Sequence, residues 1–241
     1  MDVRDPRARL IVAALPEVGE TARVVGQEAA HARARRLSPS ESVILLDGSG
    51  REAVAEVLLV ARGEVLFRVT EIRRAENRAS TISLFVAGLR SERLAWTVEK
   101  ATELGAARVV VVASERTQSF RASTGLLPRL DRVAREASKQ SGRSDWPSVS
   151  GPVDVGRVLD EEESEHRLFL DFGGDRFPRQ LTAAPSALLI GPEGGWTDSE
   201  RSHASDRGWN IVSLPAGRLR AETAAIGALT LLRAAMQRKT G

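Results

Sequence analysis

The sequence predicts an α/β protein in two parts, a small β-barrel over residues 1–72 and a mainly parallel α/β sheet over residues 73–241. The first observation is a set of short apolar or alternating runs before residue 73, which is typical of strands. The second is the alternation of strand-like and helix-like segments from Thr81 onward, which is typical of a parallel sheet with crossover helices. The third is that the later strand-like runs are apolar throughout, as expected of strands buried on both faces.

Four strand-like runs make up the first part. They read RLIVA, SVILL, EAVAEVLLVA and EVLFRVTEI, and the turn signals between them are DGSG at residues 47–50 and RG at residues 62–63. Short strands joined by tight turns close naturally into a small barrel. The polar run RRAENRAS, residues 73–80, is interpreted as a linker.

The second part begins with the run TISLFVAGL, which predicts a strand. In the following SERLAWTVEKATELG, Leu94, Val98 and Ala101 form a helical stripe, and Gly105 fits the end of that helix. ARVVVVAS predicts a buried strand, and LPRLDRVAREASKQSGR predicts a helix that ends at Gly142. RLFLDF, SALLIG and NIVSL are three more candidate strands, most of them separated by helical patterns.

Composition excludes several kinds of site. The 241 residues are 42% hydrophobic and include no cysteine, so disulfides, a thiolate nucleophile and cysteine-ligated metals are ruled out. The N-terminal apolar run is too short for a signal peptide, and no run approaches the roughly 20 apolar residues of a membrane span, so we expect a cytoplasmic protein and no membrane. His31, His166 and His203 are scattered, and we expect no metal site.

Positive charge is concentrated in the middle of the chain. The formal net charge is only +3, but residues 73–150 hold 14 Lys and Arg against 8 Asp and Glu. A basic segment in a nearly balanced chain indicates a surface for a polyanion such as RNA. An ordinary solvated arginine surface is the alternative, and charge alone does not exclude it.

The stretch LLIGPEGGWTDSE, residues 188–200, combines a buried strand, a glycine-rich turn and a helix start. Thr197 and Glu200 have the spacing of a capping box, which places the helix start directly after the glycines. The turn therefore lies at the carboxyl end of a parallel strand, where open α/β sheets bind ligands. Glycine lets backbone groups approach a ligand closely, although a tight turn without a ligand is the alternative. No P-loop or G-x-G-x-x-G pattern is present, so we do not expect a nucleotide phosphate.

A second stretch, SLPAGRLRAETAAIGALTLL, repeats this layout with a strand, a Pro/Gly loop and a helix from about Ala221. Arg218 and Arg220 in the loop suit contacts to an anion or a carbonyl group. Glu222 falls in the first helical turn, where a capping role is the alternative to a role in a site. The helix is apolar on more than one face, so it lies in the core or packs against a second subunit.

Together these two loops resemble the RsmE family, SPOUT-class methyltransferases that methylate N3 of a uridine in small-subunit (16S) ribosomal RNA. Further matches are EKATELGA at residues 99–106, SERT at 114–117 and EASKQSGR at 136–143. The matches follow the family order and span nearly the whole chain.

The resemblance implies a PUA-like β-barrel that binds RNA over residues 1–72 and a SPOUT methyltransferase domain with a C-terminal trefoil knot over residues 73–241. It also implies a homodimer built on the C-terminal domain. The implied cofactor is S-adenosyl-L-methionine, held by the segment after RLFLDF, the GPEGG turn and the LPAGRLRAET loop. The cofactor-binding residues implied in this way are Leu170, Asp171, Phe172, Gly191, Pro192, Glu193, Gly194, Gly195, Leu214, Pro215, Leu219, Arg220, Ala221, Glu222 and Thr223.

The sequence departs from the family pattern in two places. The family usually carries LG-x-R-I-L-R-x-E-T, whereas here Gly217 takes the place of the first arginine and Arg218 is displaced by one. The N-terminal signature H-x-x-R-V-L-R is blurred into AHARARRLSP, where Arg33 and Arg36 align and His31 is off by one.

Methylation at N3 requires the N3 proton to leave and the charge that develops on the neighbouring carbonyl oxygens to be stabilised. We assign the stabilisation of this charge to Arg220, and proton acceptance or orientation to Glu222 or Glu193. Contacts to 16S rRNA, mainly through phosphates, are assigned to Arg33, Arg36, Arg90, Arg93, Lys100, Arg116 and Arg143.

Two other functions stay open from the sequence. One is a ribosome-assembly protein that binds RNA and has lost catalysis, which cofactor binding would test. The other is a related SPOUT enzyme that acts on a ribose 2′-hydroxyl or on transfer RNA, which the identity of the methylated nucleoside would test.

Overall fold

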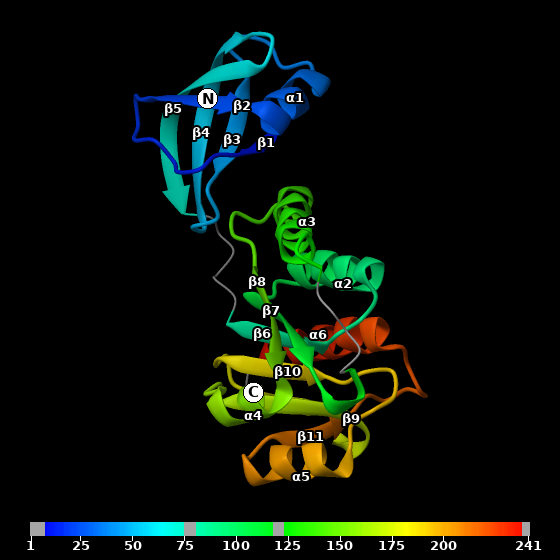
Figure 1. Ribbon diagram of the computed structural model, residues 1–241. Coiled ribbons are helices and arrows are strands. Elements are labelled where there is room, and N and C mark those ends of the chain that lie inside the picture. The colour runs from blue at the N-terminus through cyan, green and yellow to red at the C-terminus, as the bar shows by residue number, and fades with distance from the viewer. Residues whose placement is uncertain (1–7, 75–80, 118–122, 238–241) are drawn as a thin grey trace. The chain divides into compact units, whose positions relative to one another are not determined.

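The computed structural model describes residues 8–74, 81–117 and 123–237. The chain divides into two compact units, shown in Figure 1. Unit 1 comprises residues 1–79 together with Ser138–Asp145, and unit 2 comprises residues 80–137 and 146–241. Nothing in the sequence pattern indicated that residues 138–145 join unit 1.

Unit 1 is built on a five-stranded sheet in the order β1-β3-β4-β5-β2. Its elements are β1 (Arg9–Ile11), β2 (Thr21–Val25), α1 (Gly26–Ala34), β3 (Ser42–Leu46), β4 (Arg51–Val60) and β5 (Glu64–Arg74). β1 and β3 are parallel, and the other neighbours are antiparallel. The sheet is curled into a half-barrel (Figure 1), and within residues 8–74 the end strands β1 and β2 do not pair.

The alternating runs that predicted these strands place one face of the sheet in the core. In β5, the side chains of Val65, Phe67 and Val69 are buried and belong to the same apolar cluster as Leu10 and Leu45. Two details differ from the sequence prediction. Helix α1 follows β2 where only strands were expected, and β5 continues through the first two residues of the expected linker, whose residues 75–80 lie outside the described ranges.

A buried carboxylate organises the charged residues of unit 1. Glu52 on β4 accepts hydrogen bonds from Arg9 (2.7 Å), from Arg73 (3.1 Å) and from the hydroxyl of Ser144. Burial acts to raise the pKa of Glu52, but the hydrogen bonds from Ser144 and Arg9 and the charge of Arg9 outweigh it and lower this pKa below its usual value of 4.5. Glu52 is therefore held in its charged form by its partners.

Unit 2 is built on a six-stranded sheet in the order β11-β9-β10-β6-β7-β8, in which every neighbouring pair is parallel. The strands are β6 (Ile82–Ala87), β7 (Arg108–Ala113), β8 (Ser148–Asp154), β9 (His166–Arg176), β10 (Ser186–Ile190) and β11 (Asn210–Ser213). The helices are α2 (Ser91–Glu103), the short 3-10 helix η1 (Glu115–Thr117), α3 (Leu126–Ser141), α4 (Val155–Glu161), α5 (Asp198–Asp206) and α6 (Ala221–Gln237). The predicted parallel α/β sheet is confirmed.

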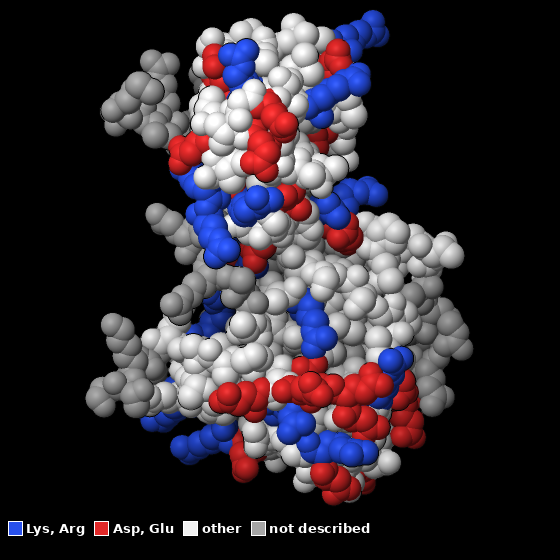
Figure 2. All heavy atoms as spheres, turned by 90° about the vertical axis from the view of Figure 1, so that its left-hand side faces the viewer, with Lys and Arg blue, Asp and Glu red and all other residues white. Residues whose placement is uncertain are grey.

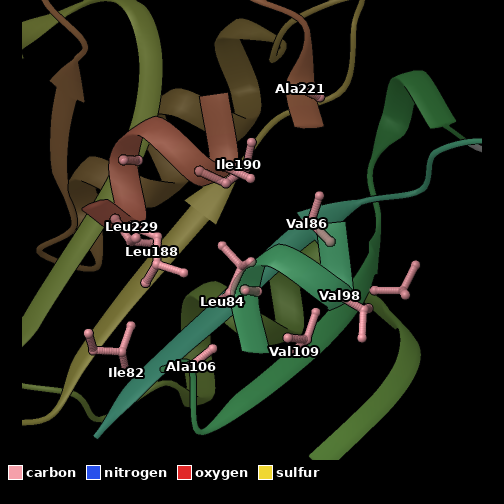
Figure 3. Close-up of a cluster of buried hydrophobic side chains, with 14 of the residues drawn as sticks. Ile82, Leu84, Val86, Val98, Ala106, Val109, Leu188, Ile190, Ala221 and Leu229 are labelled. Carbon is pink, nitrogen blue, oxygen red and sulfur yellow. The ribbon is translucent and has the colours of Figure 1, made fainter. Parts of the chain in front are cut away.

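Helices cover both faces of this sheet. On one face, side chains of α2 and α6 such as Val98 and Leu229 pack against Leu84 and Leu188 of the central strands, as Figure 3 shows. On the other face, residues of α4 and α5 contribute to a second apolar cluster. Strand β7 supplies alternate residues to the two clusters, which explains why its sequence is an unbroken apolar run.

Two strands of unit 2 differ from their predicted extent. Strand β8 was not predicted, because its Gly151 and Pro152 are turn signals; it lies at the edge of the sheet, where proline is tolerated. Strand β9 continues past the predicted strand RLFLDF to Arg176 and so includes Gly173 and Gly174. A Cβ atom on Gly174 would lie 2.7 Å from the backbone of Val212, so glycine here permits β11 to approach.

In the described part of the chain, no helix is both long enough and apolar enough to cross a lipid bilayer.

We expect Glu52→Gln to lower the free energy of unfolding at pH 7 by about 2 kcal/mol, because a neutral amide leaves the half-buried guanidinium of Arg9, and the exposed guanidinium of Arg73, without their counter-charge. The folded-state pKa of Glu52 is lowered, so its stabilisation is present above about pH 4.5 and is lost as the pH falls through the folded-state pKa. Denaturant titrations at pH 7 and in acid would measure this. Glu71→Gln, at an exposed position of β5, is the control and should change stability by less than about 0.5 kcal/mol. A Glu52→Gln deficit of equal size in acid would contradict the electrostatic role.

Candidate functional site

Three segments meet at the carboxyl ends of neighbouring strands in unit 2. The order β11-β9-β10 makes these three parallel strands adjacent. The end of β9, the turn after β10 and the loop after β11 consequently line one cavity of about 690 Å³. This is the position at which open α/β sheets bind ligands.

Most residues predicted to hold a cofactor line this cavity, which we call the first cavity. They are Leu170, Asp171, Phe172, Gly191, Pro192, Glu193, Gly194, Gly195, Leu214, Leu219 and Ala221. Pro215, Arg220, Glu222 and Thr223 were predicted with them but are not among its lining residues. Arg220 is exposed just before α6, and Glu222 pairs with Arg93 instead.

A buried indole fixes the geometry of the turn after β10. Trp196 is only 1% exposed, and its Nε1–H donates a hydrogen bond to the carbonyl of Leu170 (2.9 Å). Its ring lies against Phe169, with 4.6 Å between the ring centroids. A Cβ atom on Gly191 would lie 2.7 Å from Trp196 Nε1 and 2.8 Å from Cε2, so only glycine fits at this position. The indole thus ties the turn after β10 to the middle of β9, at the residue that pairs with the last residue of β10.

The start of α5 is fixed by the predicted capping box. The Thr197 hydroxyl accepts from the Glu200 amide, and Glu200 Oε2 accepts from the Thr197 amide (2.8 Å). The other oxygen of Glu200, Oε1, accepts from the amide of Glu115 (2.9 Å). One buried carboxylate therefore joins η1 to the end of the glycine-rich turn.

An ion pair lies on the β9 side of the first cavity. Arg201 Nε donates to Asp171 (2.6 Å), and Arg201 NH1 donates to Asp198 (2.7 Å). The hydrogen bond with Asp171 raises the pKa of Arg201, so this side chain stays fully charged.

Arg93 of α2 brings the two candidate glutamates together. Its NH1 group hydrogen-bonds to Glu193 in the glycine-rich turn, and its Nε lies 3.5 Å from Glu222 Oε1 at the start of α6. The second oxygen of Glu222, Oε2, is buried without a hydrogen-bond partner. Arg93, which the sequence assigned to RNA, is therefore engaged by two carboxylates.

A second cavity, of about 470 Å³, lies beside the first. It is lined by the segment between β6 and α2, by the first turn of α2 including Arg93, by η1 and by the start of α3. It shares four residues with the first cavity: Arg116, Pro192, Glu193 and Gly194. The guanidinium of Arg116 donates to the carbonyl of Gly194. The glycine-rich turn and Arg116 thus form a boundary common to both cavities.

The other residues assigned to RNA have different surroundings. Arg33 and Arg36 in unit 1 and Arg90 in unit 2 are exposed. Lys100 is held between Glu99 and Glu103, each at 2.8 Å, which raises its pKa. The Arg143 side chain is buried and paired with Asp145 (2.9 Å), so the predicted contact of Arg143 with RNA does not fit the structure.

Acidic side chains gather in a band on the face of unit 2 seen in the lower part of Figure 2. Lys and Arg side chains lie directly beside this band on the same face, so the charge there is mixed. Among residues 8–74, 81–117 and 123–237, no group of three His, Asp or Glu side chains could hold a metal ion.

The chain matches a family profile described as "RNA methyltransferase domain" over residues 76–233. It is 32% identical over 235 residues to the ribosomal RNA small subunit methyltransferase E of Mycobacterium tuberculosis, covering 89% of this chain and 87% of the relative. The chain belongs to the RsmE family. A Rickettsia conorii RsmE relative is 27% identical over 82% of each chain.

Solved structures of RsmE-like proteins share this fold. A methyltransferase from Legionella pneumophila, solved with bound SAM, superposes with a TM-score of 0.82 at 25% identity and covers 95% of this chain and 98% of that one. The RsmE of Neisseria gonorrhoeae superposes with a TM-score of 0.83 at 24% identity, again covering 95% and 98%. Because each superposition includes 95% of this chain, it includes residues of both units.

Sequence reasoning missed three contributors to this RsmE site. The pair of Arg201 with Asp198 could have been anticipated, because the capping box places the two residues three apart at the start of α5, whereas the pair of Arg201 with Asp171 is a tertiary contact. The pairing of Arg93 with two glutamates and the position of Arg116 between two cavities depend on tertiary contacts, and no local pattern signals them.

We expect Gly191→Ala to lower the free energy of unfolding by about 1–3 kcal/mol, because the added methyl group would collide with the buried indole of Trp196. Chemical denaturation at neutral pH would measure the loss. Gly173→Ala is the matched control, since a Cβ atom there meets no atom within 4 Å, and it should cost less than about 0.5 kcal/mol. Equal losses in the two variants would rule out the steric role of the indole.

Proposed function

We propose that this protein transfers a methyl group from S-adenosyl-L-methionine to N3 of a specific uridine in the 16S ribosomal RNA of the small subunit. The observation that carries the proposal is the convergence of three glycine- or proline-rich segments on one cavity, in a chain that belongs to the RsmE family. The bound SAM in the Legionella pneumophila structure and the names of the curated relatives support the cofactor and the RNA class.

The first cavity fits such a cofactor in size and in chemistry. Its walls combine backbone at Gly173, Gly191 and Gly194 with the apolar side chains of Leu214 and Leu219. Glycine backbone can hydrogen-bond to an adenine ring and an amino-acid group at close range, and the apolar side chains can cover the ring. Charged side chains of both signs also line the cavity, which suits a ligand that carries an ammonium, a sulfonium and a carboxylate.

When bound, the cofactor supplies a methyl carbon whose bond to sulfur breaks, with its electron pair left on sulfur, as N3 takes the carbon. The residues of this chain have to hold the uridine and remove its N3 proton. We assign proton acceptance to Glu193, because it is the carboxylate that lines both cavities in the described part of unit 2. Glu222 lines neither cavity and acts through Arg93, which holds Glu193 in place.

The domain types, the knot and the oligomeric state are also part of this proposal. We infer that residues 1–72 form a PUA-like RNA-binding domain, which the exposed Arg33 and Arg36 support, and that residues 73–241 form a SPOUT domain with a C-terminal trefoil knot. We also infer a homodimer through that domain, supported by half-exposed apolar side chains on α6 such as Ile226 and Leu231. The proposed substrate places the protein in the cytoplasm.

Nucleoside analysis by mass spectrometry of 16S rRNA from a strain lacking this protein would test the proposed reaction. We expect N3-methyluridine to be missing and to return when the wild-type gene is restored. Loss of a 2′-O-methylated nucleoside, or of a transfer RNA modification, would identify the related SPOUT enzymes instead. Isothermal titration with SAM would test the remaining alternative, a ribosome-assembly protein that binds RNA without catalysis, because such a protein has no need to bind SAM.

We expect Glu193→Gln to lower the turnover number about 100-fold while SAM affinity changes little, because an amide cannot accept the N3 proton. Glu222→Gln should cause a smaller loss, since it loosens Arg93 without removing the acceptor. Methyl transfer to small subunits lacking the modification, measured with radiolabelled SAM, reports both variants. Glu163→Gln, an exposed position lining neither cavity, is the control. A larger loss in Glu222→Gln than in Glu193→Gln would reverse the assignment.

A further inference from the structure

The second cavity adjoins the first cavity along the glycine-rich turn. Its volume is about 470 Å³, and its lining residues in the described ranges belong to unit 2. Pro192, Glu193, Gly194 and Arg116 line both cavities, so a molecule in one cavity meets a molecule in the other at these residues. A methyl donor and its acceptor must come together in this way for the reacting atoms to reach near-attack distance.

The groups lining the second cavity match the edge of a uracil ring. This edge presents an N3–H donor between two carbonyl acceptors, O2 and O4. Glu193 supplies a carboxylate acceptor, and Arg116 supplies a guanidinium that only donates. One donor of Arg116 is used by the carbonyl of Gly194, and a guanidinium has five donors, so others can reach a ligand.

The same groups disfavour cytosine. Cytosine presents a bare acceptor at N3, which the carboxylate of Glu193 would repel, and an amino group where uracil has O4, which the guanidinium of Arg116 would repel. A mismatched buried donor or acceptor is costly, so this arrangement would select uracil over cytosine.

The remaining walls suit a flat ring with a phosphate behind it. Leu89 and Leu126 are buried side chains that present apolar surface to the cavity, and Pro192 adds a third apolar wall. Arg90 is exposed and lines the second cavity but not the first, so it can reach the phosphate of the nucleotide.

We propose that the second cavity holds the target uracil ring, with Glu193 at N3–H and the guanidinium of Arg116 on the neighbouring carbonyl oxygen O4. This inference rests on the proposed function. Removing the N3 proton leaves negative charge on O2 and O4, and a cation fixed at one of these oxygens stabilises it. The role that the sequence assigned to Arg220 therefore passes to Arg116, because Arg220 lines neither cavity.

The decisive variant is Arg116→Ala, assayed with SAM and small ribosomal subunits that lack the modification. We expect turnover to fall at least about 100-fold, as when one donor to a developing oxyanion is removed. We also expect the pH–rate profile to move to higher pH, because without the cation the N3 proton is harder to remove. Arg116→Lys keeps the charge and should recover part of the rate. Arg157→Ala, on α4 and lining neither cavity, should behave as wild type.

A second variant tests the cavity itself without touching Arg116 or Glu193. Ser123 is exposed and lines only the second cavity. Ser123→Trp should fill the space and abolish methyl transfer while SAM binding by isothermal titration stays within about twofold of wild type. Ser123→Ala, which removes only the hydroxyl, should retain most of the rate. Thermal melting of each variant would establish that it folds.

The outcomes separate this inference from the proposed function. If the wild-type protein does not bind SAM or yields another methylated nucleoside, the proposed function is wrong. If the wild type makes N3-methyluridine but Ser123→Trp and Arg116→Ala keep its rate, the uracil assignment is wrong. If Arg116→Ala weakens SAM binding and leaves the pH–rate profile in place, Arg116 only braces the glycine-rich turn, and its role toward the uracil is overturned.

Discussion

The candidate site depends on one packing constraint, the buried indole of Trp196 against the backbone at Gly191. The indole occupies the volume that any side chain at residue 191 would need, and its N–H holds the carbonyl of Leu170. The turn after β10 is thereby fixed against β9 before a ligand arrives. Interiors pack densely enough that such a contact admits few alternative arrangements, so the shape of the first cavity follows from it.

The charged side chains around the two cavities have different partners. Arg93 neutralises part of the negative charge of Glu193 and Glu222. Arg116 lies at the boundary between the two cavities, and its one hydrogen bond among the described residues goes to the carbonyl of Gly194. A site that removes a proton and stabilises the resulting anion needs an acceptor and a cation at separate positions. In the proposed reaction, Glu193 would be the acceptor and Arg116 the cation.

Much of the fold follows from local patterns, but the division of roles within the site does not. Apolar runs identified five of the six strands of unit 2, and the spacing of Thr197 and Glu200 identified the start of α5. Strand β8 was missed because Gly151 and Pro152 usually interrupt strands. The surroundings of Arg93 and Arg143 could not be predicted, since an exposed and a paired arginine have the same sequence signature and differ only in tertiary contacts.

The carboxylate of Glu200 has a consequence for the motions of this region. Its two oxygens accept from the amides of Glu115 and Thr197, which are remote in sequence, so a movement of Glu200 exposes both amides to solvent at once. These two amides should therefore show correlated hydrogen–deuterium exchange and report one shared opening event rather than two. The 3-10 turn and the start of α5 would then behave as a single cooperative unit.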